Sequence, residues 1–126
     1  MYKNDNFIAS LLQAFNGLKS CIRTEKNAKF HLAATIIIIL LASFLSLKVV
    51  DWVLILLAIS LVWISELFNT AIEYLFDVSH PEIDPRVKYA KDISAAAVLI
   101  AAVFSIFVGI LILGPPLYRW IINFFG

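Results

Sequence analysis

Three long apolar segments dominate the hydrophobic pattern of the chain. Each is close to the ~20 residues that a helix needs to cross a bilayer, and an open strand in lipid would leave its backbone groups unpaired. We therefore expect three transmembrane helices, at about residues 31–48, 52–77 and 92–114. Pro115 and Pro116 are expected to end the last regular helix near Gly114, because proline cannot donate a backbone hydrogen bond.

The segment before the first span has a different pattern, over about residues 6–29. Its apolar side chains recur at helical spacing and form one stripe: Ile8, Leu11, Leu12, Phe15, Leu18 and Ile22. Lys19 and Arg23 flank this stripe, where long basic side chains can reach lipid headgroups. The pattern predicts an amphipathic helix on the membrane surface, with packing against a partner protein as the alternative.

The expected fold class is thus all-α integral membrane, with the surface helix and three transmembrane helices in a single domain, residues 1–126. Composition agrees, because 62% of the 126 residues are hydrophobic and a soluble chain of this size could not bury that much apolar surface. The formal net charge of +1 decides nothing by itself, and no nucleic-acid partner is expected.

The distribution of basic residues predicts the orientation. Eight of the ten Lys and Arg residues lie before the first span or between the second and third, and the other two are Lys48 and Arg119. Positively charged segments stay on the cytoplasmic side. We expect the N-terminus and the loop at residues 77–92 in the cytoplasm and the C-terminus outside a bacterial cytoplasmic membrane.

Polar side chains inside the second span are the most informative feature of the chain. Glu66, Asn69, Glu73 and Asp77 are spaced by three and four residues, so they lie on one face of a helix. An ionised carboxylate near mid-bilayer costs about 3 kcal/mol even on the lenient insertion scale. Such a stripe therefore indicates a function.

Three interpretations of this stripe remain open. It could be a structural polar seam between helices in a non-enzymatic membrane protein. It could be part of a proton or ion pathway, although the outer half of the span, from Trp52 to Ile64, offers only Ser60. It could instead be a site that is entered from the cytoplasm and ends within the membrane, where a lipid headgroup meets a soluble substrate.

Other charged residues are expected at the same depth. Glu25 closes the surface helix, and Lys91 and Asp92 begin the third span. Glu25 and Glu73 together could bind magnesium, because Mg²⁺ prefers hard oxygen ligands and keeps several waters. Lys91 would be a cation for phosphate. Small side chains on the third span are instead expected to form a packing face: Ala90, Ser94, Ala97, Ala101 and Ser105.

The string from Glu66 through Asn69 to Glu73, followed by Asp77 and by Ala90-Lys91-Asp92, closely resembles the signature of the prokaryotic diacylglycerol kinase family. That family includes the undecaprenol kinases. The resemblance extends over nearly the whole chain, and it implies phosphoryl transfer from ATP with Mg²⁺ to a lipid alcohol by a homotrimer. The chain contains no glycine-rich phosphate-binding loop of the P-loop type.

Residue roles follow from the resemblance alone. Glu66 matches the general base of the family, with Asn69 beside it, and Glu25 and Glu73 match its metal-binding carboxylates. The remaining matches are polar groups around ATP and the transferred phosphate: Asp77, Glu82, Asp84, Lys91 and Asp92.

Two departures from the family pattern lie in the surface helix. Asn6 stands where members often have a basic residue, and Gln13 stands where some have an aromatic. Nucleotide or headgroup contacts from this helix are therefore not carried over. The loop from His80 to Asp92 and the start Ala14 to Leu18 resemble the undecaprenol branch more than the diacylglycerol branch, so undecaprenol is the expected acceptor and diacylglycerol the alternative.

Overall fold

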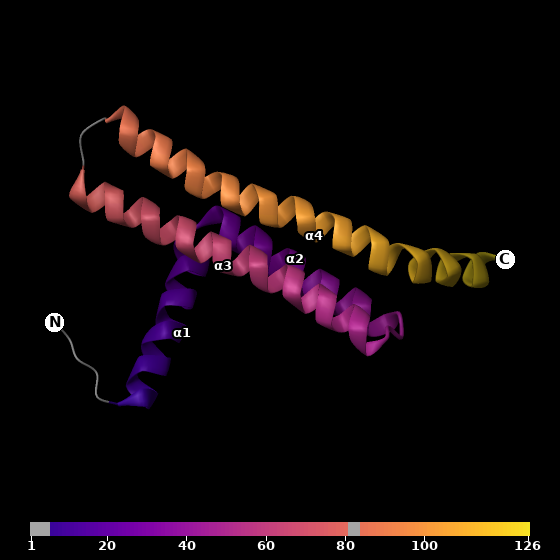
Figure 1. Cartoon of the computed structure of the whole chain (residues 1–126). Coiled ribbons are helices and arrows are strands. Elements are labelled where there is room, and N and C mark those ends of the chain that lie inside the picture. Colours follow the sequence, from indigo (N-terminus) through magenta and orange to yellow (C-terminus); the bar gives the residue numbers. More distant parts are fainter. Residues whose placement is uncertain (1–5, 81–83) are drawn as a thin grey trace.

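The computed structural model describes residues 6–80 and 84–126 and forms four helices over them (Figure 1). In chain order these are α1 (Phe7–Thr24), α2 (Lys26–Phe44), α3 (Val49–Ser79) and α4 (Pro85–Phe125). Three of them, α2, α3 and α4, are long and apolar enough to cross a membrane. The prediction of an N-terminal helix followed by three spanning helices is confirmed, and the chain is a multi-pass membrane protein.

Helix α1 lies at a steep angle to the other three (Figure 1). It begins where the side chain of Asn6 accepts a hydrogen bond from the backbone N–H of Ile8 at 3.1 Å. It ends before residue 29, the limit expected from the sequence, because Glu25 has an extended backbone with φ −93° and ψ 127°. Lys26 and Lys29 consequently belong to α2. The start of the apolar stripe is exposed, as a helix lying on lipid requires.

Helices α2, α3 and α4 run antiparallel to their neighbours in sequence (Figure 1). A short turn joins α2 to α3, and within it Ser46 has a φ of 50°, in the left-handed region. Helix α4 packs along α3, and Ser105 donates a hydrogen bond to the backbone carbonyl of Ala58 at 3.1 Å. This contact supports the expected packing face, although Ala97, assigned to the same face, is exposed.

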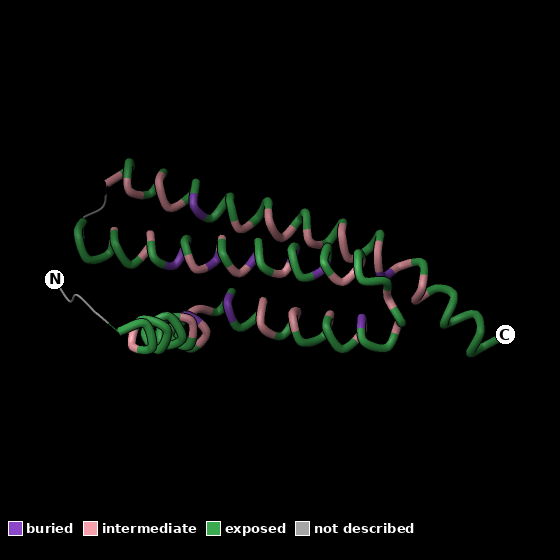
Figure 2. Tube along the Cα trace, turned by 60° about the horizontal axis from the view of Figure 1, so that its bottom comes forward, coloured by how far each residue is buried: buried purple, intermediate pink, exposed green. Residues whose placement is uncertain are grey.

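The expected end of the last helix near Gly114 is wrong. Helix α4 continues through Pro115 and Pro116 to Phe125. Each proline removes only one donor from the helix, and the residues that follow form helical bonds of their own. At ~1.5 Å per residue, its 41 residues extend roughly 60 Å, twice the thickness of the hydrocarbon core. Its last turns therefore project beyond the other helices (Figure 2).

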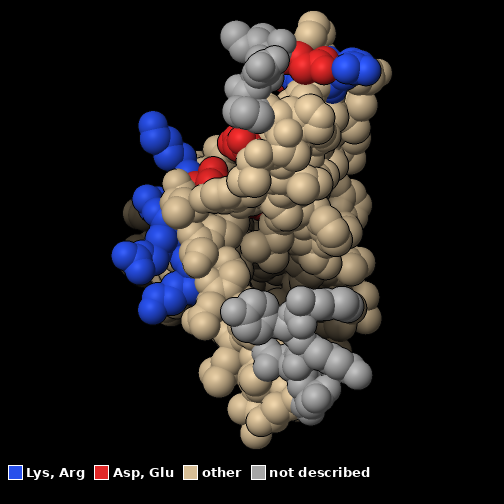
Figure 3. Space-filling model, turned by 90° about the vertical axis from the view of Figure 1, so that its left-hand side faces the viewer, with Lys and Arg blue, Asp and Glu red and all other residues tan. Residues whose placement is uncertain are grey.

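The main buried apolar cluster lies at the end of the bundle that carries the α2–α3 turn. A core cluster forms near the α2–α3 turn from Ala42, Ile55 and Leu113, and Trp52 packs against it. Most other large apolar side chains are exposed, as expected for surfaces in contact with lipid or with other protein (Figure 2). Figure 3 looks onto the opposite end, where basic side chains gather along one flank and acidic ones lie nearby.

Candidate functional site

The site centres on Glu66, whose side chain is buried on α3 with an exposed fraction of 1%. Its Oε2 atom has no hydrogen-bond partner among the described residues. The closest ionisable contact is His31 on α2, whose Nε2 lies 3.7 Å from this oxygen. A buried carboxyl oxygen without a hydrogen-bond partner is costly, and such groups are concentrated at functional sites.

A chain of hydrogen bonds leads from α4 to the next carboxylate on α3. Ser94 donates to Oδ1 of Asn69 at 2.7 Å, and Nδ2 of Asn69 donates to Oε1 of Glu73 at 3.0 Å. Ser94 also bonds to the backbone carbonyl of Lys91 at 2.8 Å. The amide of Asn69 is therefore fixed in one orientation, with its N–H₂ toward the carboxylate.

Glu25 joins this group from the junction of α1 and α2. The negative charges of Glu25 and Glu73 both act on the carboxyl group of Glu66. The described Lys and Arg side chains form no ion pair with any of these three carboxylates. The site therefore brings three carboxyl groups together, and no Lys or Arg in the described part of the chain pairs with them.

The carboxylates of Glu25 and Glu73 suit Mg²⁺ better than they suit a metal ion whose ligands all come from the protein. Within residues 6–80 and 84–126, no group of three His, Cys, Asp or Glu side chains is arranged to enclose a metal ion. Two carboxylates, Glu25 and Glu73, leave the remaining positions to water and phosphate oxygens, which is how proteins usually bind Mg²⁺.

The next charged residues lie at the polar end of the bundle. Asp77 on α3 and Lys91 on α4 form an ion pair, which places both on the same side as Glu73. Asp92 is exposed and pairs instead with Lys88 on its own helix, at 2.6 Å. The structure therefore brings Lys91 toward the site and turns Asp92 away from it.

Asp84 has a structural role at the start of α4. Its side chain accepts a hydrogen bond from the backbone N–H of Arg86 at 2.8 Å, which caps the helix. The Arg86 side chain also pairs with it and holds the pKa of Asp84 below its usual range. Glu82, the other residue assigned to the loop, lies outside the described residues.

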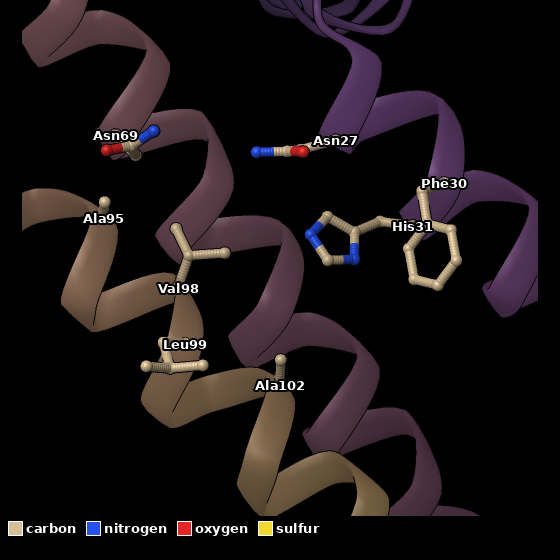
Figure 4. A pocket seen from close by; sticks show the side chains of 8 residues that line it. All are labelled: Asn27, Phe30, His31, Asn69, Ala95, Val98, Leu99 and Ala102. Atoms are coloured by element: carbon tan, nitrogen blue, oxygen red, sulfur yellow. The ribbon is translucent and has the colours of Figure 1, made fainter.

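A cavity of about 270 Å³ adjoins the site between α2 and α4, with α3 behind it (Figure 4). Its polar side chains are Asn27, His31 and Asn69. The other lining residues are apolar: Phe30, Ala95, Val98, Leu99 and Ala102. Three of the lining side chains are polar and the rest are apolar, so the cavity suits an amphipathic molecule with a small polar head.

Two residues of the site were missed by sequence reasoning. His31 served only to mark the end of the first span, and Ser94 was assigned to the packing face. A weak signal existed for His31, because it is an ionisable side chain directly before the uncharged apolar run at residues 32–47. Ser94 gave none, since a small hydroxyl residue is common at helix contacts.

The arrangement favours a site that opens at one end of the bundle. The buried polar residues of α3 all lie in its half nearer Ser79: Glu66, Asn69 and Thr70. In the other half of α3, Ser60 bonds to its own helix at the carbonyl of Leu56, and the buried residues are apolar. A pathway for ions across the bundle would have to pass this apolar half.

Comparisons with known proteins identify the chemistry. Residues 12–113 match the sequence model of the family described as prokaryotic diacylglycerol kinase. The chain is 36% identical to an undecaprenol kinase of Bacillus subtilis over 90% of this chain and 92% of that protein. It is 35% identical to a diacylglycerol kinase of Synechocystis over 89% of this chain and 65% of that protein. A diacylglycerol kinase of Helicobacter pylori is 31% identical over 79% of this chain and 77% of its own length.

The family match at residues 12–113 includes α2, α3, most of α4 and the residues around Glu66. The family implies ATP-dependent phosphoryl transfer to a membrane lipid. The chain therefore belongs to the prokaryotic diacylglycerol kinase family and is a lipid kinase.

Proposed function

We propose that this lipid kinase phosphorylates undecaprenol to its monophosphate at the cytoplasmic face of a bacterial cytoplasmic membrane. The observation that carries the proposal is the unpartnered Oε2 of Glu66, buried beside a cavity that is polar on one side and apolar on the other. The similarity to an undecaprenol kinase over nearly the full length of both chains supports this acceptor. Diacylglycerol is the second candidate, because two further relatives bear that name.

Glu66 acts as the general base in this proposal. The lipid hydroxyl transfers its proton to Oε2 of Glu66 while its oxygen bonds to the γ-phosphorus of ATP, and the bond from that phosphorus to ADP breaks. Burial of Glu66 excludes water, so the lipid hydroxyl is the nucleophile that meets the phosphoryl group. Such a base contributes about 10²- to 10⁴-fold to the rate. Asn69 helps by holding the neighbouring Glu73 in place.

Glu25 and Glu73 would hold Mg²⁺ through their carboxylate oxygens. The bound ion would supply charge neutralisation on the phosphate oxygens, which is most of what phosphoryl transfer requires. The hydrogen bond from Asn69 supports the assignment of Glu73, because it holds this carboxylate on the face of α3 that carries Glu66.

Charged side chains near the end of α3 and the start of α4 complete the proposed nucleotide site. Lys91 offers its ammonium group to the phosphates, and Asp77 positions that group through their ion pair. The assignments of Asp84 and Asp92 have less support, since one caps α4 and the other faces outward. Glu82 lies outside the described residues and remains a prediction from the family resemblance.

The orientation and assembly are parts of the same proposal. Basic residues gather at the end that carries α1 and the start of α4, which favours that end as the cytoplasmic one. The C-terminus would then lie outside. A homotrimer, expected from the family resemblance, would cover part of the extensive exposed apolar surface.

One experiment tests the function directly. Purified protein is incubated in mixed micelles with labelled ATP, magnesium and either undecaprenol or diacylglycerol, and labelled lipid is separated and counted. The proposal expects undecaprenol monophosphate as the main product. If labelled phosphatidic acid, the product from diacylglycerol, exceeds labelled undecaprenol monophosphate, diacylglycerol is the preferred acceptor. If neither undecaprenol nor diacylglycerol becomes labelled, both proposed acceptors are wrong.

A further inference from the structure

His31 occupies a position that the kinase chemistry described above leaves unused. It lies on the first spanning helix, where its Nε2 atom is 3.7 Å from Oε2 of Glu66. Its ring also lines the cavity (Figure 4). Its side chain is 12% exposed, whereas that of Glu66 is 1% exposed. Of the two, only the histidine lines the cavity.

Each turnover leaves a proton on the base. Phosphorylation of a lipid hydroxyl by ATP releases one proton, which the carboxylate of Glu66 must give up before it can act again. Water reaches this carboxyl group poorly, because the side chain is buried. The charged groups acting on Glu66 are Glu25 from the α1–α2 junction and Glu73 from α3. Neither of them forms a hydrogen bond with it among the described residues.

We infer that His31 positions Glu66 and carries its proton out to the cavity. In the first step, Nε2 of His31 accepts the proton from Oε2 of Glu66. The two atoms are 3.7 Å apart, and a small side-chain movement brings them into hydrogen-bond distance. Nδ1 of the ring then releases a proton to water in the cavity. Imidazole suits this task because its two nitrogens can accept and donate in turn near neutral pH. The inference rests on the proposed role of Glu66 as base.

The kinetic test removes the ring and then supplies it from solution. His31→Ala should lower kcat about 100-fold with little change in the KM for ATP, because the loss lies in the chemical cycle and not in nucleotide binding. Free imidazole should restore a substantial part of kcat, since the deleted ring leaves space next to an existing cavity of about 270 Å³. A residue that only stabilised the fold would show no rescue.

His80 provides the matched control, because it is the other histidine and lies exposed at the end of α3. His80→Ala should keep the wild-type kcat, and imidazole should not raise it. A wild-type kcat in His31→Ala, or an absence of rescue, would overturn the proton transfer.

An infrared measurement tests the pair without turnover. The spectrum is recorded at acid pH, where the Glu66 carboxyl group is protonated, and its carbonyl band is identified by its loss in Glu66→Gln. That band should shift in frequency in His31→Ala and remain unchanged in His80→Ala. An unchanged band in both variants would overturn the inference even if lipid phosphorylation is observed. Absence of lipid phosphorylation by the wild type, with a shifted band, would instead count against the proposed function alone.

Discussion

Ser94 on α4 donates a hydrogen bond of 2.7 Å to Oδ1 of Asn69 on α3, and this bond orients the amide that contacts Glu73. Two helices that pack through small side chains thereby share one buried polar network. Such a network can transmit a change on α4 to a carboxylate on α3, because Asn69 bonds to Ser94 through its oxygen and to Glu73 through its nitrogen.

Replacement of Ser94 by alanine should therefore reduce activity. An interhelical hydrogen bond of this kind contributes about 0.6–1.5 kcal/mol, and that range corresponds to a fall in kcat of about 3- to 10-fold. Steady-state kinetics with labelled ATP would measure it. Ser105→Ala is the control, since Ser105 makes a similar bond to α3 at Ala58, away from the carboxylates. Equal losses in both variants would mean that helix packing, and not the orientation of Asn69, explains the effect.

Glu66→Gln should abolish most lipid phosphorylation while the protein still inserts and folds. Glutamine keeps the shape of the side chain but cannot accept a proton, so kcat should fall by about 10²- to 10⁴-fold. Asp51→Asn makes the same chemical change at the other end of α3 and should leave the rate unchanged. If Glu66→Gln kept turnover near that of the wild type, another group would have to be the base.

Glu73→Gln and Glu25→Gln should each raise the concentration of magnesium that is needed for half-maximal activity. Removal of one carboxylate from a site with two protein ligands weakens cation binding, and an amide oxygen replaces it poorly. A magnesium titration of lipid phosphorylation provides the measurement, and EDTA should abolish activity in the wild type. An unchanged titration in both variants would reject these residues as ligands.

Lys91→Met should raise the KM for ATP more than it lowers kcat. A hydrogen bond to a charged group contributes about 1.5–3 kcal/mol, which corresponds to a rise of about 10-fold or more. Lys88→Met is the comparison, because Lys88 pairs on the outer face of the same helix, and exposed pairs contribute little. Equal KM values for the two variants would remove Lys91 from the phosphate site.

Ser46→Gly should stabilise the protein without changing its activity. Ser46 has a φ of 50° at the turn after α2, and a left-handed backbone costs a residue with a side chain about 1 kcal/mol relative to glycine. A higher midpoint of unfolding in mixed detergent should result. A lower midpoint would show that greater freedom of the glycine in the unfolded chain outweighs the relief of strain.

The helices and their amphipathic character could be predicted from the sequence by itself. Apolar runs of spanning length admit only helices in lipid, because every backbone donor and acceptor must be satisfied within the segment. The positions of Glu66, Asn69, Glu73 and Asp77 on one face of α3 likewise follow from helical spacing. The end of α4 did not follow, since prolines in a long helix remove single bonds and leave its direction and length to the surroundings.

Contacts between helices were decided only by the tertiary structure. Spacing along one helix does not say which neighbour faces it, so the approach of His31 to Glu66 and of Ser94 to Asn69 could not be predicted from the sequence. The same limit applies to charged residues. The sequence predicts Asp92 as a site residue, but in the structure it is exposed and pairs with Lys88 on its own helix. Local sequence determines which side chains share a face, and packing of one helix on another determines what that face meets.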